Sequence, residues 1–319
     1  MTTDIIPLGI ASAVPAQNRH LSALAVERKG RVLLFDCGEG TQFRLLRAGL
    51  RRARIDAIFV THLHGDHCYG LPGLLSTMAL QQRTEPISLV VPTGTRAMLA
   101  AIPGVGRDDL PFPLRITEVD ENLTQTTVYE TDELTVEARP LEHRDFAMGF
   151  RLEERVRPGR FDPERAQALG VPEGPAFARL QGGETVTLAD GTTVRPEQVL
   201  GPPRPGIVFA YVTDTRPCDG GRALADGADL LYHEATFAED LQARAVETGH
   251  STAREAAAVA RDAGADRLLL GHLSARYDES APLQTEARSV FRDAEIAEEL
   301  RRYTLDPREK APGPTSSGT

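Results

Sequence analysis

Residues 58–67 read Ile-Phe-Val-Thr-His-Leu-His-Gly-Asp-His, which places three imidazoles and one carboxylate within six positions behind an apolar run. The run from Ile55 to Val60 predicts a buried strand, so the polar residues fall in the loop at its carboxyl end, where open α/β sheets place their sites. In an extended segment His62 and His64 point the same way and can share one ion. A solvated His-rich turn would not explain this spacing behind a strand. Imidazole and carboxylate suit zinc, manganese or iron without any thiolate.

The composition is that of a globular protein, with 41% apolar and 26% charged side chains among 319 residues. This length allows one large α/β domain or two smaller ones. No stretch approaches the roughly 18 apolar residues of a membrane span, and the first four residues lack the form of a signal peptide, so we expect a cytoplasmic protein without membrane contact. The net charge of −10 does not by itself indicate a nucleic-acid binder.

The three cysteines are odd in number and widely spaced, which argues against a disulfide framework and a Cys-based zinc site. Cys68 follows His67 and could be a ligand, although a buried thiol is the favoured interpretation.

One arginine-rich stretch follows the glycines at Gly38 and Gly40. A helix is predicted from Gln42 to Ala53, in which Arg44, Arg47 and Arg51 would form one stripe. This stripe is either a solvated helix face or a phosphate-binding strip.

The remaining chain alternates strands and helices, except for residues 153–206. That segment is rich in proline and glycine, has little apolar periodicity and is close to neutral in charge. It is either a flexible linker or a protruding arm that meets a partner. We therefore predict a main domain from residues 1–152 and 207–305, an inserted arm at 153–206 and a disordered tail at 306–319.

Further polar side chains follow later predicted strands. His143, Asp214 and His272 each come at a strand end, as His62 does, and five of the eight histidines of the chain occupy such positions. The full set of candidate ligands is His62, His64, Asp66, His67, His143, Asp214 and His272. Seven ligands are too many for one ion and suit two ions that share a carboxylate, roughly 3.5–4 Å apart, as in phosphodiester hydrolases.

The His-x-His-x-Asp-His motif, followed by a distant His, an Asp and a His, resembles the metallo-β-lactamase superfamily, whose fold is an αββα sandwich of the α/β class. Within it, further motifs resemble the ribonuclease Z family of tRNA 3′-processing endonucleases. These motifs are Asp36-Cys37-Gly38-Glu39-Gly40-Thr41-Gln42, His233-Glu234-Ala235-Thr236, His250-Ser251-Thr252, Gly271-His272-Leu273-Ser274-Ala275-Arg276-Tyr277 and the inserted arm. The resemblance covers residues 5–305.

The resemblance implies two divalent metal ions per subunit, Zn²⁺ or Mn²⁺. It assigns His62, His64 and His143 to the first metal and Asp66, His67 and His272 to the second, with Asp214 as the bridge. A metal-bridged hydroxide would attack the phosphodiester, with Asp66 as its proton acceptor. Glu234 and His250 would form a dyad that protonates or stabilises the leaving 3′-oxygen. A helix-cap role for His250 is the less favoured alternative.

The resemblance also implies the partners of the protein. The substrate would be precursor tRNA, cleaved at its 3′ trailer, with the arm gripping the tRNA elbow and two subunits forming a homodimer. The substrate-binding residues expected are Arg19, Arg276, Tyr277, Arg44 and Arg47. The family loop Pro-x-Lys-x-Arg-Asn is here Pro15-Ala16-Gln17-Asn18-Arg19-His20, so CCA recognition and the balance between endonuclease cleavage and exonuclease trimming stay open.

Two other interpretations of these motifs compete with this one. One is a small-molecule hydrolase of the same superfamily, above all a cyclic-nucleotide-like phosphodiesterase. The arm and the motif at 233–236 argue against it. The other is an inactive RNA-binding relative, which the presence of all seven candidate ligands disfavours.

Overall fold

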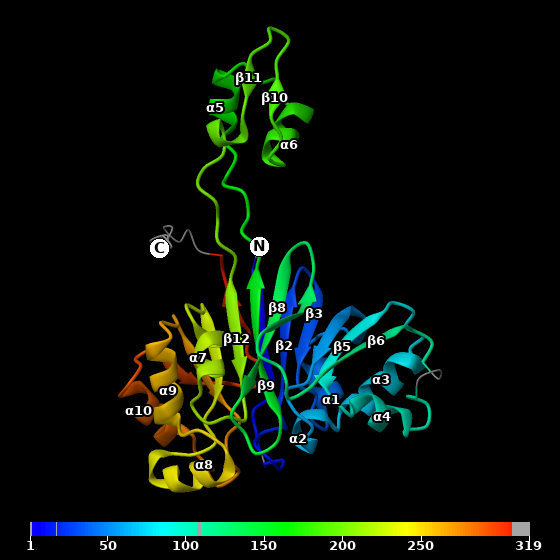
Figure 1. Ribbon diagram of the computed structural model, residues 1–319, viewed down its shortest axis with the longest axis vertical. Helices are drawn as coiled ribbons and strands as arrows, with labels where there is room; N and C mark the ends of the chain where they lie inside the picture. Colours follow the sequence, from blue (N-terminus) through cyan, green and yellow to red (C-terminus); the bar gives the residue numbers. More distant parts are fainter. Residues whose placement is uncertain (1, 17, 107–109, 308–319) are drawn as a thin grey trace. The chain divides into compact units, whose positions relative to one another are not determined.

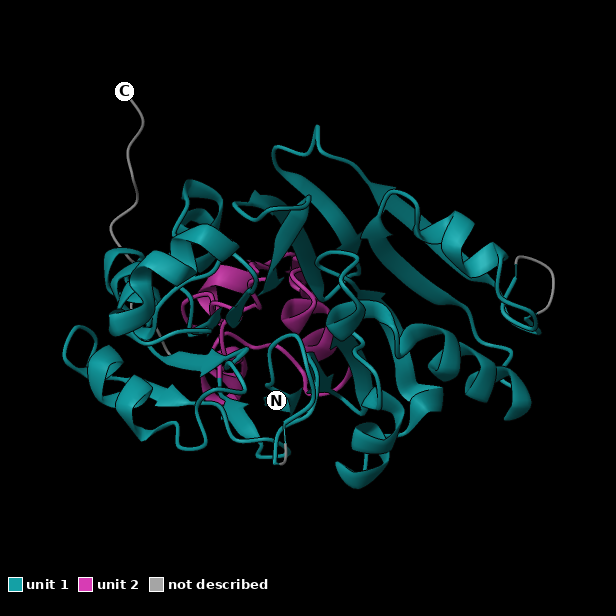
Figure 2. Cartoon of the chain, turned by 90° about the horizontal axis from the view of Figure 1, so that it is seen from below, with its two compact units in different colours: residues 1–153, 207–306 teal, residues 154–206, 307–319 magenta. Residues whose placement is uncertain are grey.

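The computed structural model describes residues 2–16, 18–106 and 110–307. The chain divides into two compact units (Figure 2). One consists of residues 1–153 and 207–306, and the other contains residues 154–206. Most of the predicted tail at 306–319 lies outside the described residues.

The first unit contains two sheets of seven strands. The first sheet runs in the spatial order β16 (Tyr303–Leu305), β1 (Thr3–Gly9), β2 (Ala23–Arg28), β3 (Arg31–Phe35), β4 (Ile55–Phe59), β5 (Ile87–Pro92) and β6 (Leu114–Val119). The second sheet runs in the order β15 (Ala294–Ile296), β14 (Leu268–Gly271), β13 (Leu230–Glu234), β12 (Val208–Val212), β9 (Ala147–Glu154), β8 (Leu134–Leu141) and β7 (Thr126–Glu130). Strands β3 to β6 are parallel, and so are β12 to β15. Their carboxyl ends therefore collect at one edge of each sheet.

Helices cover the outer face of each sheet (Figure 1). Over the first sheet lie α1 (Thr41–Arg47), α3 (Leu71–Leu80) and α4 (Thr95–Ala100), and over the second lie α7 (Asp219–Ala225), α9 (Ala253–Asp262) and α10 (Ala281–Arg288). Shorter elements are α2 (Gly65–Cys68), α8 (Gln242–Thr248), and the 3₁₀ turns η1 (Arg52–Arg54) and η3 (Glu239–Leu241). The predicted αββα sandwich is confirmed. None of the helices in the described part of the chain has the length and apolar character needed to cross a membrane.

Successive side chains of a strand point to opposite faces of the sheet, which explains why each strand contributes to two cores. On β3 and β4, Leu34 and Ile58 belong to the core under the helices, whereas Phe35 and Phe59 point into the core between the sheets. Phe35 stacks on Phe59 at 4.9 Å and meets Phe209 of the opposite sheet edge-on at 5.9 Å. This aromatic contact joins the two sheets directly beneath the ends of β4 and β12, which carry the candidate ligands.

The second unit is a folded module. It contains α5 (Pro163–Ala168), α6 (Pro175–Gln181), a hairpin of β10 (Val186–Thr187) and β11 (Thr193–Val194), and the 3₁₀ turn η2 (Pro196–Gln198). Its own core buries Ala166, Val171, Leu180, Val186, Val194 and Val199. The linker alternative for this segment is therefore wrong. The elements are too short for their apolar periodicity to stand out in the sequence.

The predicted arginine-striped helix is also wrong in its length. Helix α1 ends at Arg47, because Gly49 takes a left-handed conformation with φ 72° that stops the helix. Arg51 lies beyond this break, at the start of η1, so the stripe does not form.

Candidate active site

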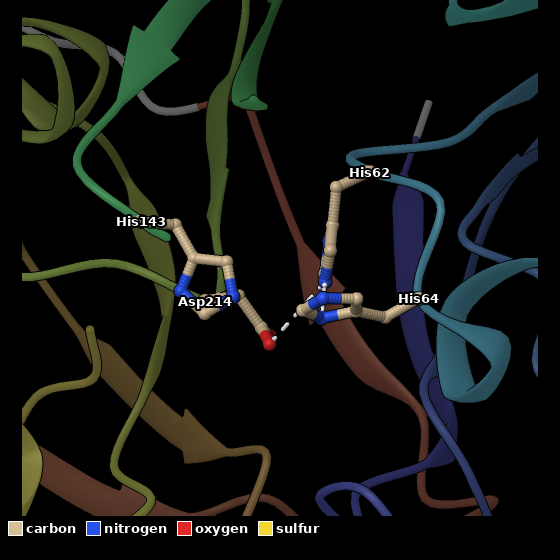
Figure 3. A group of neighbouring side chains, drawn as sticks. All are labelled: His62, His64, His143 and Asp214. Carbon is tan, nitrogen blue, oxygen red and sulfur yellow. Dashed lines mark hydrogen bonds and ion pairs between the residues drawn. The ribbon is translucent and has the colours of Figure 1, made fainter. Parts of the chain in front are cut away.

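The first ligand cluster forms where β4, β8 and β12 end. His62, His64, His143 and Asp214 each offer a ligand atom, and these atoms all lie within 4.8 Å of one another. Figure 3 shows their side chains converging from both sheets. His62 Nε2 lies 2.9 Å from His64 Nδ1 and 3.5 Å from Asp214 Oδ2. The sequence placed these residues correctly at strand ends.

A second cluster contains Asp66, His67 and His272. His272 Nε2 lies 3.3 Å from His67 Nε2 and 3.4 Å from Asp66 Oδ2. Asp214 Oδ1 is 3.2 Å from His67 Nε2 and 3.1 Å from His272 Nε2. One oxygen of Asp214 thus faces this cluster and the other faces His62 of the first cluster.

Asp36 orients the second cluster, a role that the sequence did not reveal. Its buried carboxylate lies 2.7 Å from His67 Nδ1 and accepts the backbone N–H of Thr61 at 2.8 Å. Because Nδ1 of His67 is engaged there, Nε2 is left to face the cluster. The Asp36-Cys37-Gly38 motif pointed to this residue only as one part of the family resemblance, and it did not indicate the contact with His67.

Partners outside the clusters fix the other imidazoles. His64 Nε2 lies 2.8 Å from Asp145 Oδ2, and His143 Nδ1 donates to the carbonyl of Gly249 at 2.8 Å. His143 Nε2 is buried and has no hydrogen-bond partner among the described residues. A buried nitrogen acceptor without a donor, aimed at other imidazoles, is the arrangement that a metal ion satisfies. The donor set therefore fits divalent metal ions.

Electrostatics favour the ligand form of the shared carboxylate. Burial opposes ionisation of Asp214, yet the imidazoles of His272 and His67 hold its pKa well below the usual range. Cys68 behaves as a buried thiol, since burial raises its pKa to about 11 and its Sγ lies 3.5 Å from the Leu63 carbonyl oxygen. A thiolate ligand is disfavoured there.

Glu234 and His250 form a hydrogen-bonded pair beside the clusters. His250 Nδ1 lies 2.9 Å from Glu234 Oε1 and 4.0 Å from Asp214 Oδ2. Burial opposes protonation of His250, but the Glu234 carboxylate outweighs burial and raises the pKa of the imidazole to about 9. Burial also opposes ionisation of Glu234, whose pKa His250 lowers to about 2. The pair can hold a proton next to the metal ligands at neutral pH.

Backbone and side-chain donors hold Glu234 in place. Its Oε1 accepts the N–H of Thr215 at 2.7 Å, and its Oε2 accepts the hydroxyl of Thr236 at 2.6 Å. The same threonine hydroxyl lies 2.9 Å from His272 Nδ1, so the dyad and the second cluster share a partner.

The residues expected to bind substrate have different surroundings. Arg276 lies over the ring of Phe237 at 5.6 Å and, with His250, lines a groove of about 330 Å³. Arg19 instead donates to the carbonyls of Ser274 and Tyr277. The hydroxyl of Tyr277 accepts the N–H of Ala238 at 2.9 Å.

Arg44 and Arg47 differ sharply although they share a helix. Arg44 is 6% exposed, donates to the carbonyl of Leu8 at 2.9 Å and pairs with Glu299 at 2.6 Å. Arg47 is exposed. The contacts of Arg44 lie within the protein, and the structure gives no support for its expected role at the substrate.

An αββα sandwich with a paired His/Asp centre at its strand ends defines a metallo-β-lactamase-type hydrolase. A family model described as "Beta-lactamase superfamily domain" matches residues 198–273, and one described as "Anti-Pycsar protein Apyc1" matches residues 3–102. The chain is 73% identical to ribonuclease Z of Salinibacter ruber, with 98% of each chain covered. Ribonuclease Z of Halorubrum lacusprofundi is 47% identical, with 91% of this chain and 93% of that protein covered. The chain belongs to the ribonuclease Z family.

Solved structures agree with this assignment. Human tRNase Z, short form, has a TM-score of 0.68 at 27% identity and is covered over 99% of its length by 96% of this chain. The metallo-β-lactamase fold protein YhfI from Bacillus subtilis has the same TM-score at 17% identity, over 96% of this chain and 100% of that chain, a likeness in fold alone.

Proposed function

We propose that this protein is an endoribonuclease that removes the 3′ trailer of precursor tRNA in a metal-dependent hydrolysis. The observation that carries the proposal is the pair of ligand clusters joined by Asp214 and flanked by the Glu234–His250 dyad, in a chain 73% identical to a ribonuclease Z. We propose a cytoplasmic location together with this tRNA substrate.

The donor set suggests how metal ions would be held. His62, His64 and His143 would hold one ion, Asp66, His67 and His272 a second, and Asp214 would contact both. When bound, the ions would polarise the phosphoryl group and activate water for attack. Imidazole and carboxylate ligands accept Zn²⁺ and Mn²⁺, and both are proposed as working metals.

The protein groups carry the proton transfers. Asp66 accepts a proton from the attacking water, and the imidazole of His250 delivers one to the leaving 3′-oxygen. Glu234 supports that delivery, because its carboxylate raises the pKa of His250 and fixes Nδ1 at 2.9 Å. The other ring nitrogen, Nε2, is then the one that faces the substrate.

We also propose that the arm binds tRNA away from the cleavage site. It is a folded module with exposed arginines, which suit contacts with phosphates. These arginines are Arg155, Arg160, Arg165, Arg179 and Arg195.

A homodimer is proposed through the exposed face of α1. Phe43 and Leu46 lie one helical turn apart there and are 65% and 64% exposed, and Tyr69, which follows α2, is 67% exposed. Single exposed apolar side chains are common, but neighbouring ones on one helix face, such as Phe43 and Leu46, are typical of an association surface. Leu46→Asp should convert a dimer to a monomer in size-exclusion chromatography with light scattering. The matched control Val246→Asp, on α8 with 58% exposure, should leave the mass unchanged. A monomeric wild-type protein would refute the dimer.

A comparison of two substrates, assayed separately, tests the proposed activity. The purified protein, freed of metal and then supplied with Zn²⁺ or Mn²⁺, is given precursor tRNA and, separately, a 3′,5′-cyclic nucleotide. We expect cleavage of the precursor tRNA only with metal and a far lower kcat/KM for the cyclic nucleotide. Efficient cyclic-nucleotide hydrolysis without tRNA cleavage would refute the proposal.

A further inference from the structure

Glu299 lies outside the metal clusters yet is the centre of a partly buried hydrogen-bond network. Its side chain is 10% exposed and follows β15. Oε1 accepts the backbone N–H of His20 at 2.6 Å and that of Ile10 at 3.3 Å. Oε2 lies 2.8 Å from His20 Nδ1 and 2.6 Å from the guanidinium of Arg44. Only a carboxylate can accept at all four positions, because an amide has a single acceptor oxygen.

The loop at 10–20 connects this network to the candidate active site. The backbone N–H of Ala13 donates to Asp66 Oδ2 at 2.7 Å, and Ala13 has a positive φ of 61°, which is uncommon for a residue with a side chain. Such a conformation persists only where the surrounding contacts enforce it. Both ends of the loop are fixed by Glu299, through Ile10 and His20.

The loop also adjoins the residues around His272. The N–H of Ser12 donates to the carbonyl of Leu273 at 3.1 Å, and Arg19 donates to the carbonyls of Ser274 and Tyr277. A shift of the loop would therefore move the hydrogen bond between Ala13 and Asp66. It would also move the segment after β14 that carries His272.

We propose that Glu299 is a positioning residue for the proposed reaction. It acts through the loop at 10–20 to hold the Ala13 amide against Asp66, and so sets the orientation of that carboxylate in the second ligand cluster. Arg44 is the buried partner that orients Glu299 through its contact at 2.6 Å, which gives this arginine a role far from the RNA phosphates. His20, which occupies the place of an asparagine in the family loop, contributes both its backbone N–H and its imidazole.

Glu295 provides a matched control on the same segment. It is also a partly buried carboxylate that meets two arginines, Arg267 at 3.1 Å and Arg301 at 3.4 Å, but it makes no hydrogen bond to the described residues of the loop at 10–20. Glu295→Gln therefore removes a comparable charge and leaves the positioning network intact.

The test compares Glu299→Gln with Glu295→Gln by hydrogen exchange of the metal-free proteins, followed by mass spectrometry. Glutamine keeps one acceptor oxygen but turns an amide N–H₂ toward Arg44 and His20. We expect the peptide over the loop at 10–20 to lose protection in Glu299→Gln only, while peptides from β12 and β13 stay protected in both variants.

Metal titration and kinetics complete the test. In Glu299→Gln we expect the Mn²⁺ affinity of one of two sites to fall by about 10–100-fold, as with other residues that orient metal ligands. We also expect kcat for a small phosphodiester to fall. The melting temperature should stay near that of Glu295→Gln. His20→Ala removes one contact and should give a smaller change. Unaltered loop protection and Mn²⁺ affinity in a folded Glu299→Gln would overturn the inference. Hydrogen exchange and Mn²⁺ titration do not use RNA. A failure of the proposed tRNA activity would therefore appear separately, as a lack of tRNA cleavage by the wild-type protein.

Discussion

His250 is the residue whose replacement separates proton transfer from metal binding. Its imidazole bonds to Glu234 and belongs to neither of the two ligand clusters, although with Asp214 and His272 it forms a third group of side chains close enough to share an ion. We expect His250→Ala to lower kcat for precursor tRNA by roughly 10²–10⁴-fold, the usual loss for a general acid. Metal content by mass spectrometry should stay at the wild-type value. His143→Ala is the matched comparison, because it removes a ligand and should lower metal content. Loss of metal from His250→Ala would mean that His250 is a ligand.

Glu234 should set the pH range in which His250 is protonated. In the wild-type protein the carboxylate raises the pKa of His250 to about 9, so the acid form persists above neutral pH. In Glu234→Gln this charge is gone and burial lowers the pKa. The alkaline limb of the rate profile should therefore move to lower pH. A profile with the same alkaline limb in both proteins would show that another group provides the proton.

Asp36 should tune metal affinity without touching a metal. Asp36→Asn keeps the size of the side chain but weakens the contact with His67 Nδ1, which measures 2.7 Å. We expect Mn²⁺ affinity to fall by about 10–100-fold, measured by titration of the metal-free protein. Asp145→Asn, whose side chain is 72% exposed, should have a smaller effect through His64. Equal affinities in all three proteins would refute the orienting role of Asp36.

At the scale of elements, helix α9 places His250 through its N-terminal cap. Thr252 and Glu255 form a reciprocal capping box, and Glu255 also pairs with Arg216, which donates to the carbonyl of His250. We expect Thr252→Ala to destabilise the protein by about 1 kcal/mol, measured by urea unfolding. Arg254→Ala, on the exposed side of the same helix, should change stability little. A neutral Thr252→Ala would show that packing alone fixes the start of this helix.

The elements also show what the sequence could reveal. Buried strands such as β5 and the ligands at strand ends were predictable, because apolar runs and chemically distinctive side chains are local signals. The capping box of α9 is a local signal of the same kind, because Thr252 and Glu255 lie three residues apart in the sequence. The early end of α1 and the fold of the arm were not, since they depend on one glycine conformation and on elements of two to seven residues. Asp36 and Glu299 act through contacts distant in sequence, which no local pattern reports.

At the scale of the whole molecule, the arm can be removed without breaking a sheet. Its two ends leave adjacent antiparallel strands, where Glu153 of β9 pairs with Val208 of β12. A short Gly-Ser linker in place of residues 156–204 should therefore leave the first unit folded. We expect KM for precursor tRNA to rise by roughly 10²-fold, as when one of two linked contacts is lost. Turnover of a small phosphodiester should stay near the wild-type rate. An equal loss on both substrates would contradict a binding role for the arm.

Mapping the cleavage site on precursor tRNA tests whether this protein is a 3′-processing endoribonuclease. The wild-type protein is incubated with an end-labelled precursor that carries a 3′ trailer, with Zn²⁺ and Mn²⁺ in separate reactions, and the products are mapped on a sequencing gel. We predict one discrete metal-dependent cut near the discriminator base, which is absent in His250→Ala. A ladder of shortened products would instead show exonuclease trimming, and no product with either metal would refute the proposed cleavage of precursor tRNA.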